Sequence, residues 1–367
     1  MTISKAKETM TSRERVLRTF AYEKPDRVPI SYFTNMLIHE KVSKLIGIPP
    51  TDFEAFYQAI GADERSIDAP FKGENKFRQL EGRIVNPVYG FYVKWVENEA
   101  GGYYDFCDFP LKDADPETIA SFHVPSPDEF DYDKALENLR YFKSKNLALY
   151  VGNAGFCDII NSTGRVMGME DTLVNIYTED EATMTYIRRR CDMELGILER
   201  LLELGGDDID FVWIGEDLGT QRGPMISLET YRRVLKPLHK EYIDLAKSYG
   251  KYVRVHSCGS SSWVYEDFIE MGVDCVDTLQ PEAVNMSPEY LINNFGKRLS
   301  YHGCMSTAGP LAYGTVEDVR KNVKEILDIM MPHGGYFFSP THAIQDNTPP
   351  ENVVAMYQAV HDMGVYK

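Results

Sequence analysis

The hydrophobic and polar positions of this sequence alternate between short runs of β-branched or aromatic residues and longer amphipathic stretches. This alternation is typical of α/β proteins. From Leu147 onward the order strand, helix, strand, helix is regular, so we expect parallel strands that are buried on both faces. The predicted strands are Arg27–Phe33, Leu147–Asn153, Phe211–Gly215, Tyr252–Cys258, Val273–Leu279, Leu299–Cys304 and Tyr336–Ser339.

Helix starts are marked by capping residues and by proline at the first helical position. A Ser or Thr followed three residues later by Glu predicts a capping box. The predicted starts are Thr11-x-x-Glu14, Thr178-x-x-Glu181 (a helix to about Leu204), Ser227 (a helix to about Ser248), Ser287-Pro288 and Thr348-Pro349-Pro350-Glu351.

Seven strands and one that the pattern misses predict a single (β/α)₈ TIM-barrel domain over residues 1–367, with an open doubly wound sheet as the alternative. The stretch from about Ile60 to Pro127 fits this rhythm poorly. Within it, GRIVNPVYGFYVKWVENEAGGYYDF alternates apolar and polar residues and contains turn glycines. We therefore expect an inserted antiparallel β-hairpin in the N-terminal third, forming a rim over the site, and the eighth strand nearby.

Composition and charge narrow the function classes. The formal net charge is −17, which disfavours nucleic acid, anionic lipid and polyanionic substrates. There is no apolar run long enough for a membrane span, and the N-terminal residues do not form a secretory signal, so we expect a cytoplasmic protein. The six cysteines are scattered, with no C-x-x-C pair. In a reducing compartment this pattern predicts free thiols or metal ligands.

In a TIM barrel, reactive residues lie at the C-terminal ends of the strands or in the loops that follow them. Polar residues follow six of the predicted strands, which makes them candidates for chemistry or binding. They are Asn153, Glu216 with Asp217 and Gln221, His256 with Cys258, Gln280, His302 with Cys304, and His342 after Ser339-Pro340-Thr341.

The most informative spacing is His256-x-Cys258. Side chains two residues apart on a strand face the same way, about 6.5 Å apart, so both can reach one zinc ion. Catalytic zinc usually has three protein ligands, and His342 or Cys304 would supply the third. The plainer interpretation is that an H-x-C pair arises by chance and that a buried Cys is a small hydrophobe.

The other polar strand ends also have plainer interpretations. Glu216 and Asp217 are then a solvated acidic loop, and Asn153 and Gln280 satisfy backbone groups. The sequence lacks G-x-x-x-x-G-K-[ST], G-x-G-x-x-G after a strand, H-E-x-x-H and G-x-S-x-G. Their absence disfavours nucleotide hydrolysis, Rossmann redox chemistry, zincin proteolysis and α/β-hydrolase chemistry.

Five segments in order resemble the uroporphyrinogen decarboxylase superfamily: RERVLRTFAYEKPDRVPI, EDLGTQRGPMISLETYRRVLKP, VRVHSCGS, LQPEAVNM and NTPPENVVAMYQAV. The resemblance covers nearly the whole chain and implies a (β/α)₈ barrel. One branch of the superfamily comprises metal-free decarboxylases of the heme pathway. The other comprises cobamide-dependent methyltransferases of the methylcobamide:coenzyme M type, in which an H-x-C pair holds zinc.

The methyltransferase branch fits this sequence better. Its third zinc ligand is a Cys just after a proline near the last strand, and here His342 occupies that place. This departure changes the expected third zinc ligand, and with it the basis for expecting a thiol substrate. The decarboxylase branch holds a polycarboxylate partly with arginines after the first strand, whereas no arginine occurs between Arg27 and Arg65 here.

The resemblance therefore implies an enzyme, a zinc methyltransferase that moves a methyl group between a corrinoid and a thiol or another small molecule. A partner protein would carry the corrinoid (methylcobamide). Glu216 and Asp217 would orient the substrate or the zinc ligands, and Asn153, Gln221, Gln280 and His302 would contact the substrate. The alternatives are a metal-free decarboxylase of a porphyrinogen or smaller carboxylate, and a non-catalytic docking module for a corrinoid protein.

Overall fold

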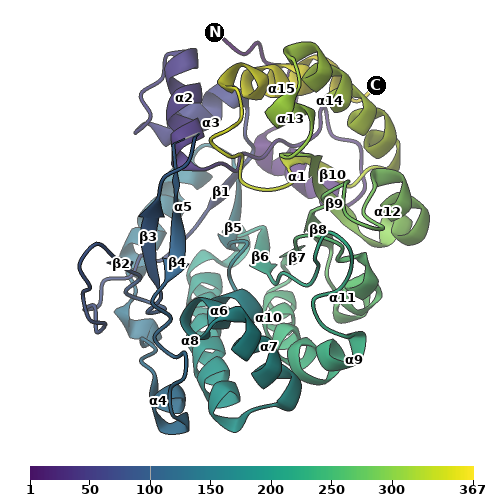
Figure 1. The fold of residues 1–367 in the computed structure, drawn as a ribbon. Coiled ribbons are helices and arrows are strands. Elements are labelled where there is room, and N and C mark those ends of the chain that lie inside the picture. Colours follow the sequence, from purple (N-terminus) through teal and green to yellow (C-terminus); the bar gives the residue numbers. More distant parts are fainter. Residues whose placement is uncertain (100) are drawn as a thin grey trace.

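The computed structural model describes residues 1–99 and 101–367. Its centre is a curled sheet of parallel strands in the order β1-β5-β6-β7-β8-β9-β10. Helices surround this sheet, so the chain has a TIM-barrel-like α/β fold (Figure 1). The strands are β1 (Glu64–Ser66), β5 (Ala148–Gly152), β6 (Phe211–Gly215), β7 (Tyr252–His256), β8 (Cys275–Thr278), β9 (Ser300–Met305) and β10 (Tyr336–Pro340).

Residues 29–31 lie between the two edges of the curled sheet. The Ser31 N–H donates to the Phe338 carbonyl in β10 at 3.0 Å, and the Asp63 N–H, just before β1, donates to the Ile30 carbonyl at 2.9 Å. The prediction of a regular strand over Arg27–Phe33 is wrong, because the segment makes only isolated bridges. Pro29 has no N–H, which interrupts a continuous ladder. The strand that the pattern missed is β1.

The first helix begins as predicted, since Thr11 and Glu14 form a capping box. The predicted start at Thr178 is wrong. Thr178 is still part of the preceding helix, and Asp180 caps the long helix instead. The helices are α1 (Ser12–Phe20), α2 (Met36–Ile46), α3 (Phe53–Ile60), α4 (Pro116–Ser121), α5 (Tyr132–Lys143), α6 (Ile160–Met167), α7 (Met169–Thr178), α8 (Glu181–Gly205), α9 (Leu228–Thr230), α10 (Lys236–Ser248), α11 (Tyr265–Met271), α12 (Pro288–Phe295), α13 (Pro310–Tyr313), α14 (Val316–Met330) and α15 (Pro350–Met363).

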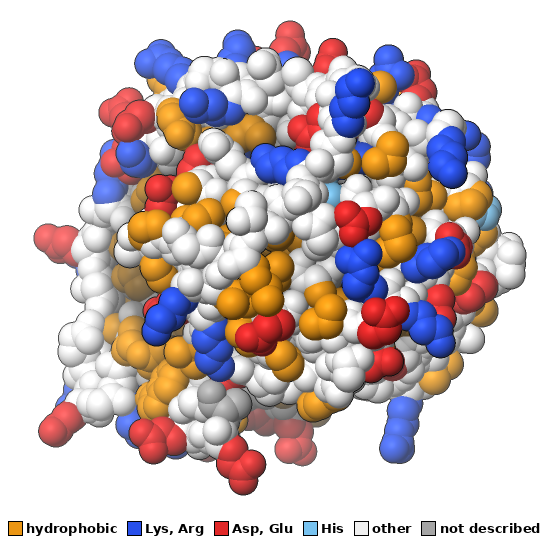
Figure 2. Space-filling model, turned by 90° about the horizontal axis from the view of Figure 1, so that it is seen from above, with side chains coloured by type: hydrophobic (Ala, Val, Ile, Leu, Met, Phe, Trp, Pro, Cys, Tyr) orange, Lys and Arg blue, Asp and Glu red, His pale blue; other side chains and the backbone are white. Residues whose placement is uncertain are grey.

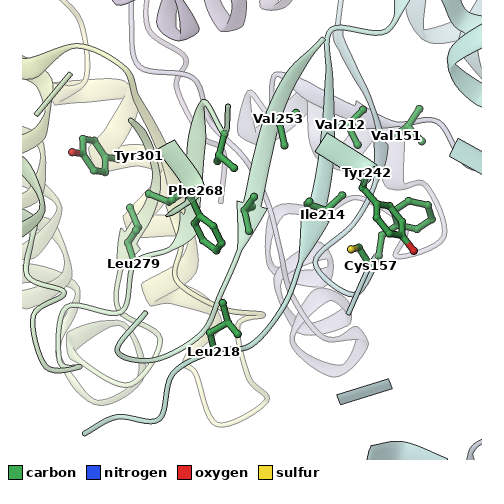
Figure 3. Close-up of a cluster of buried hydrophobic side chains, with 14 of the residues drawn as sticks. Val151, Cys157, Val212, Ile214, Leu218, Tyr242, Val253, Phe268, Leu279 and Tyr301 are labelled. Carbon is green, nitrogen blue, oxygen red and sulfur yellow. The ribbon is translucent and has the colours of Figure 1, made fainter. Parts of the chain in front are cut away.

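The hydrophobic core joins the outer face of the sheet to the helices. In the cluster drawn in Figure 3, Val212 and Ile214 of β6 belong with Tyr242 of α10 and Phe268 of α11, and all four are buried. Burying each such aliphatic side chain contributes roughly 1.5–3 kcal/mol. The core therefore fixes the strands whose C-terminal ends carry the polar residues.

Inside the sheet, aromatic rings enclose a buried ion pair. Arg254 of β7 lies 2.7 Å from Glu64 of β1 and packs over the ring of Phe211, 4.4 Å from its centroid. Phe20 of α1 stacks on Tyr252 at 4.4 Å. This packing fills the interior at the N-terminal ends of the strands and leaves space at the C-terminal ends.

A second, antiparallel sheet has the order β2-β3-β4 and lies beside the parallel sheet (Figure 1). Its strands are β2 (Ile84–Val85), β3 (Tyr92–Val96) and β4 (Tyr103–Cys107). The connection from β3 to β4 includes residue 100, which lies outside the described residues. The structure thus has three short strands over the stretch for which we predicted a hairpin, and the inserted rim hairpin itself stays a prediction.

The face drawn in Figure 2 carries both charged and apolar side chains. On the face in Figure 2, acidic and basic side chains lie interspersed among smaller apolar areas. Among the helices of the described residues, none is long and apolar enough to cross a bilayer.

Candidate functional site

A cavity of about 520 Å³ opens at the C-terminal ends of the parallel strands. Strands β1, β5, β6 and β7 and the loops after β1, β5, β6 and β10 contribute to it. This is the place where TIM-barrel chemistry is found. Its lining combines aromatic rings with carboxylates, one arginine and two histidines. The residues are Tyr32, Phe33, Tyr57, Ser66, Asp68, Tyr150, Gly152, Asn153, Ala154, Gly155, Asp158, Asn161, Arg165, Trp213, Asp217, His256 and His342.

Asp217 and His256 line this cavity, and Cys258 lies next to them. Each offers one ligand atom, and these three atoms lie within 4.8 Å of one another. The Cys258 Sγ is 3.3 Å from the His256 Nε2, which is 3.7 Å from the Asp217 Oδ1. Strand β7 ends at His256, so the predicted strand to Cys258 is too long and Cys258 lies in the loop that follows. The sequence singled out Asp217, but not as a member of the metal-binding cluster.

Two glycines allow the loops after β6 and β7 to pack against each other. A Cβ at Gly219 would lie 2.5 Å from the Ser260 nitrogen, and a Cβ at Gly259, where φ is +70°, would lie 2.4 Å from the Gly219 carbonyl oxygen. Because of this close approach, the Ser260 N–H donates to the Thr220 carbonyl at 2.7 Å. The packing holds Cys258 next to Asp217, whose Oδ1 accepts from the Cys258 N–H at 2.9 Å.

Asp277 of β8 orients His256. Its Oδ2 lies 2.7 Å from the His256 Nδ1, and its Oδ1 lies 2.5 Å from the His302 Nδ1. A carboxylate only accepts, so the Nδ1 of His256 carries the proton and the Nε2 faces Asp217 and Cys258. Sequence reasoning missed Asp277. The available signal was an Asp inside an otherwise apolar predicted strand, because a buried carboxylate requires partners.

The pKa values of the three clustered side chains are shifted by burial and by one another. Burial raises the pKa of the Cys258 thiol. Burial also acts to raise the pKa of Asp217, but the neighbouring His256 and hydrogen bonds from Cys258 and Asn161 outweigh it and the pKa is lowered. Burial acts to lower the pKa of His256, but Cys258 and Asp277 raise it well above its ordinary value. The acidic neighbours therefore favour a protonated His256, and a metal ion bound at its Nε2 would displace that proton.

Glu216, predicted as catalytic, does not line the cavity. Its carboxylate accepts from the Ile159 and Ile160 N–H groups at 2.8 and 3.0 Å and lies 3.2 Å from the His239 Nε2. It therefore caps the N-terminus of α6, whereas its neighbour Asp217 faces the cavity. Adjacent residues leave a strand on opposite faces, which explains the separation.

Three of the predicted substrate contacts have structural partners. Asn153 lines the cavity, and its Oδ1 accepts from the Gly155 N–H at 2.8 Å. Gln280 accepts from the Gly259 N–H at 2.7 Å and from Gln221 at 3.1 Å, which fixes the Cys258 loop. The Asn153–Gly155 and Gln280–Gly259 hydrogen bonds agree with the plainer interpretation that these two amide side chains satisfy backbone groups.

His302 lies deeper in the molecule. It lines an adjoining cavity of about 210 Å³, and its Nε2 is 2.9 Å from the Ser31 Oγ. Its contact with Asp277 connects it to His256. Asp277 thus lies between His302 and His256 and contacts both rings.

His342 and Cys304, the two predicted third ligands, lie in different places. His342 lines the main cavity with Asp217 and His256 but lies outside the three-residue cluster. Cys304 is fully buried and lines a separate cavity that also contains Glu282. Positive φ angles at Gly303 and Cys304 break the alternation of β9, so the His302-x-Cys304 spacing does not place both side chains together.

The parallel sheet is TIM-barrel-like, and a His, Cys and Asp cluster that could hold a metal ion lies at its strand ends. The sequence profile described as "Uroporphyrinogen decarboxylase (URO-D)" matches residues 156–363. This is more than half of the chain, and it includes Asp217, His256, Cys258 and His342. The chain belongs to the uroporphyrinogen decarboxylase family.

Individual relatives are more distant. A curated "Uroporphyrinogen decarboxylase" from Azoarcus sp. (strain BH72) is 33% identical over 67 residues, which is 18% of this chain and 18% of that protein. The match thus spans less than a fifth of the relative. Among solved structures, a "methyltransferase from Methanosarcina mazei" superposes with a TM-score of 0.67 at 16% identity, covering 96% of this chain and 99% of that one. At this identity, the similarity establishes the fold.

Proposed function

We propose that the protein is a zinc-dependent methyltransferase that moves a methyl group between a corrinoid and a thiol or another small molecule. The observation that carries this proposal is the convergence of Asp217, His256 and Cys258 within 4.8 Å at the strand-end cavity. Family membership supports a TIM-barrel enzyme, and the full-length similarity in fold to a methyltransferase supports the reaction type. We further propose that a partner protein carries the corrinoid.

The donor set suits zinc. A thiolate, an imidazole nitrogen and a carboxylate oxygen are its common ligands, and three protein ligands leave a fourth position open. His342 lines the same cavity and is the alternative to Asp217 as the third protein ligand. Bound there, zinc would lower the pKa of a thiol substrate or polarise a methyl donor as a Lewis acid.

The chain's own residues hold the ligands in place. Asn161 donates from its Nδ2 to the Asp217 Oδ2 at 2.8 Å. Asp277 fixes the His256 ring so that its Nε2 faces the cavity. Supports of this kind orient metal ligands and raise their basicity. The rings of Phe33, Trp213 and Tyr150 line the cavity and reduce the water around a reacting sulfur or methyl group.

Decarboxylation of a polycarboxylate suits this cavity less well. Arg165 is the one Lys or Arg side chain among the described residues that line it, beside the carboxylates of Asp68, Asp158 and Asp217. Several substrate carboxylates would meet like charges here, which costs binding free energy. Metal-free decarboxylation is therefore the alternative function that an experimental test has to distinguish from methyl transfer.

The test combines elemental analysis with a methyl-transfer assay. We expect about one zinc per chain in the purified protein, and loss of zinc and of thiol-dependent demethylation of methylcobalamin in the double variant His256→Ala/Cys258→Ala. Cys191→Ser, a buried Cys in α8, serves as the matched control. Stoichiometric zinc in the double variant, or a zinc-free protein that releases CO₂ from a porphyrinogen, would refute the proposal.

A further inference from the structure

Three aromatic rings form adjoining walls of the main cavity. The Tyr150 and Trp213 rings meet edge to face, with centroids 5.7 Å apart and an interplanar angle of 65°. The Phe33 and Trp213 rings do the same at 6.3 Å and 71°. Tyr57 lines the same cavity, and all four side chains also line the adjoining smaller cavity. A ligand at this junction therefore lies among several aromatic side chains. One face of the Tyr57 ring is already covered by the Arg65 guanidinium, 4.5 Å from the ring centroid.

Asp68 adds an unpaired carboxylate to these walls. It follows β1, is exposed and lines the cavity, and its Oδ2 accepts from the Ser66 Oγ at 2.7 Å. Among residues 1–99 and 101–367, no Lys, Arg or His forms an ion pair with it. Asp68, Tyr150 and Trp213 all line the main cavity, so the Asp68 carboxylate shares this space with the aromatic walls.

The arginine that lines the main cavity is already engaged. The guanidinium of Arg165 is 3.7 Å from the Asp158 carboxylate and lies over the Phe106 ring, 5.1 Å from its centroid. The charge of Arg165 is therefore balanced locally, while that of Asp68 is not. This difference makes the aromatic end of the cavity attractive to a cation and unattractive to an anion.

Aromatic faces attract cations through the quadrupole of the ring, and several rings around one ammonium group are the common way in which proteins bind methylated amines. A nearby carboxylate strengthens the attraction without requiring a directional hydrogen bond. The net charge of −17 acts in the same direction at longer range.

We propose that Asp68 and the rings of Phe33, Tyr57, Tyr150 and Trp213 form a subsite for an organic ammonium group. The small molecule that donates or accepts the methyl group is thus a positively charged amine compound. The substrate assignment rests on the proposed function, since the reacting end would lie at Asp217, His256 and Cys258. The binding itself can be measured without turnover.

The experiment is calorimetric titration of the full chain, with zinc content measured on the same sample. Choline is the cationic probe, and 3,3-dimethyl-1-butanol is its uncharged isostere. We expect saturable choline binding that is at least about tenfold tighter than binding of the isostere. Asp68→Asn should weaken choline binding about tenfold and leave the affinity for the isostere unchanged. Asp133→Asn, an exposed carboxylate of α5, should change neither.

Equal affinities for the two probes, no choline binding to the wild-type chain, or unchanged choline binding in Asp68→Asn would each overturn the ammonium subsite. Circular dichroism of Asp68→Asn confirms that the variant is folded. Choline binding in a chain that holds no zinc would refute the zinc methyltransferase while supporting the subsite. Bound zinc and methyl transfer without a preference for choline would support the zinc methyltransferase and refute the ammonium subsite.

Discussion

The Oδ2 of Asp277 lies 2.7 Å from the Nδ1 of His256, on the side of the ring opposite to Cys258. This contact fixes the tautomer and the orientation of the imidazole before any ion binds. His302 holds the other Asp277 oxygen, so the orientation is set from the interior of the molecule. The candidate site is therefore supported by the same strands that form the sheet.

Asp277→Asn should weaken zinc binding about 10- to 100-fold, because the imidazole loses the charged acceptor that orients it and raises its basicity. Competition with a chelator of known affinity measures the change. Asp267→Asn is the matched control, because Asp267 is equally buried but pairs with Arg232 and Lys236. Unchanged zinc affinity in Asp277→Asn would show that Asp277 does not support the ligand.

Cys258→Ser should remove most of the bound zinc, whereas Cys304→Ser should retain it. The first thiol lies in the cluster, while the second lines a separate cavity. Elemental analysis of both purified variants gives the answer directly. Zinc loss in Cys304→Ser but not in Cys258→Ser would show that Cys304 is the ligand and would contradict the geometry.

Glu216→Ala should lower the free energy of unfolding by about 2–4 kcal/mol and leave the zinc content unchanged. The substitution removes the acceptor for the buried Ile159 and Ile160 N–H groups. Urea denaturation monitored by circular dichroism measures the loss. A stable variant without zinc or methyl transfer would instead favour the predicted catalytic role.

Acid should destabilise the fold partly through Asp26. Burial acts to raise its pKa, but hydrogen bonds from Arg15, Thr9 and Met10 lower it from 3.8 to about 2. Ionised Asp26 thus stabilises the folded state above about pH 4, and this contribution is lost as the pH falls towards 2.

Asp26→Asn should therefore lower the free energy of unfolding by about 1 kcal/mol near neutral pH, a value reduced for solvent screening. Below pH 3 the difference in stability between the variant and the wild type should become smaller. Denaturation midpoints at pH 7, 4 and 2.5 provide the comparison. The exposed Asp133→Asn variant should follow the wild type at each pH. A constant deficit for Asp26→Asn across this range would mean that its ionisation does not contribute.

Much of the architecture could be predicted from local pattern alone. The apolar run Phe211–Gly215 forms β6 within the predicted bounds, and the capping box of Thr11 and Glu14 starts α1 as expected. Both features are local, because burial on two faces and a satisfied helix N-terminus are written in neighbouring residues. Arg27–Phe33 failed as a strand because its pairing depends on two distant sheet edges.

The sequence by itself determined the parallel α/β core and placed His256, Cys258, Asp217 and His342 at strand ends. Only the tertiary structure decided which of these side chains meet. It brought Asp217 to His256 and Cys258, added Asp277 behind the ring, and directed Glu216 and Cys304 elsewhere. The physical reason is that spacing along a strand fixes a side chain's face, whereas convergence depends on the register of neighbouring strands and the path of their loops.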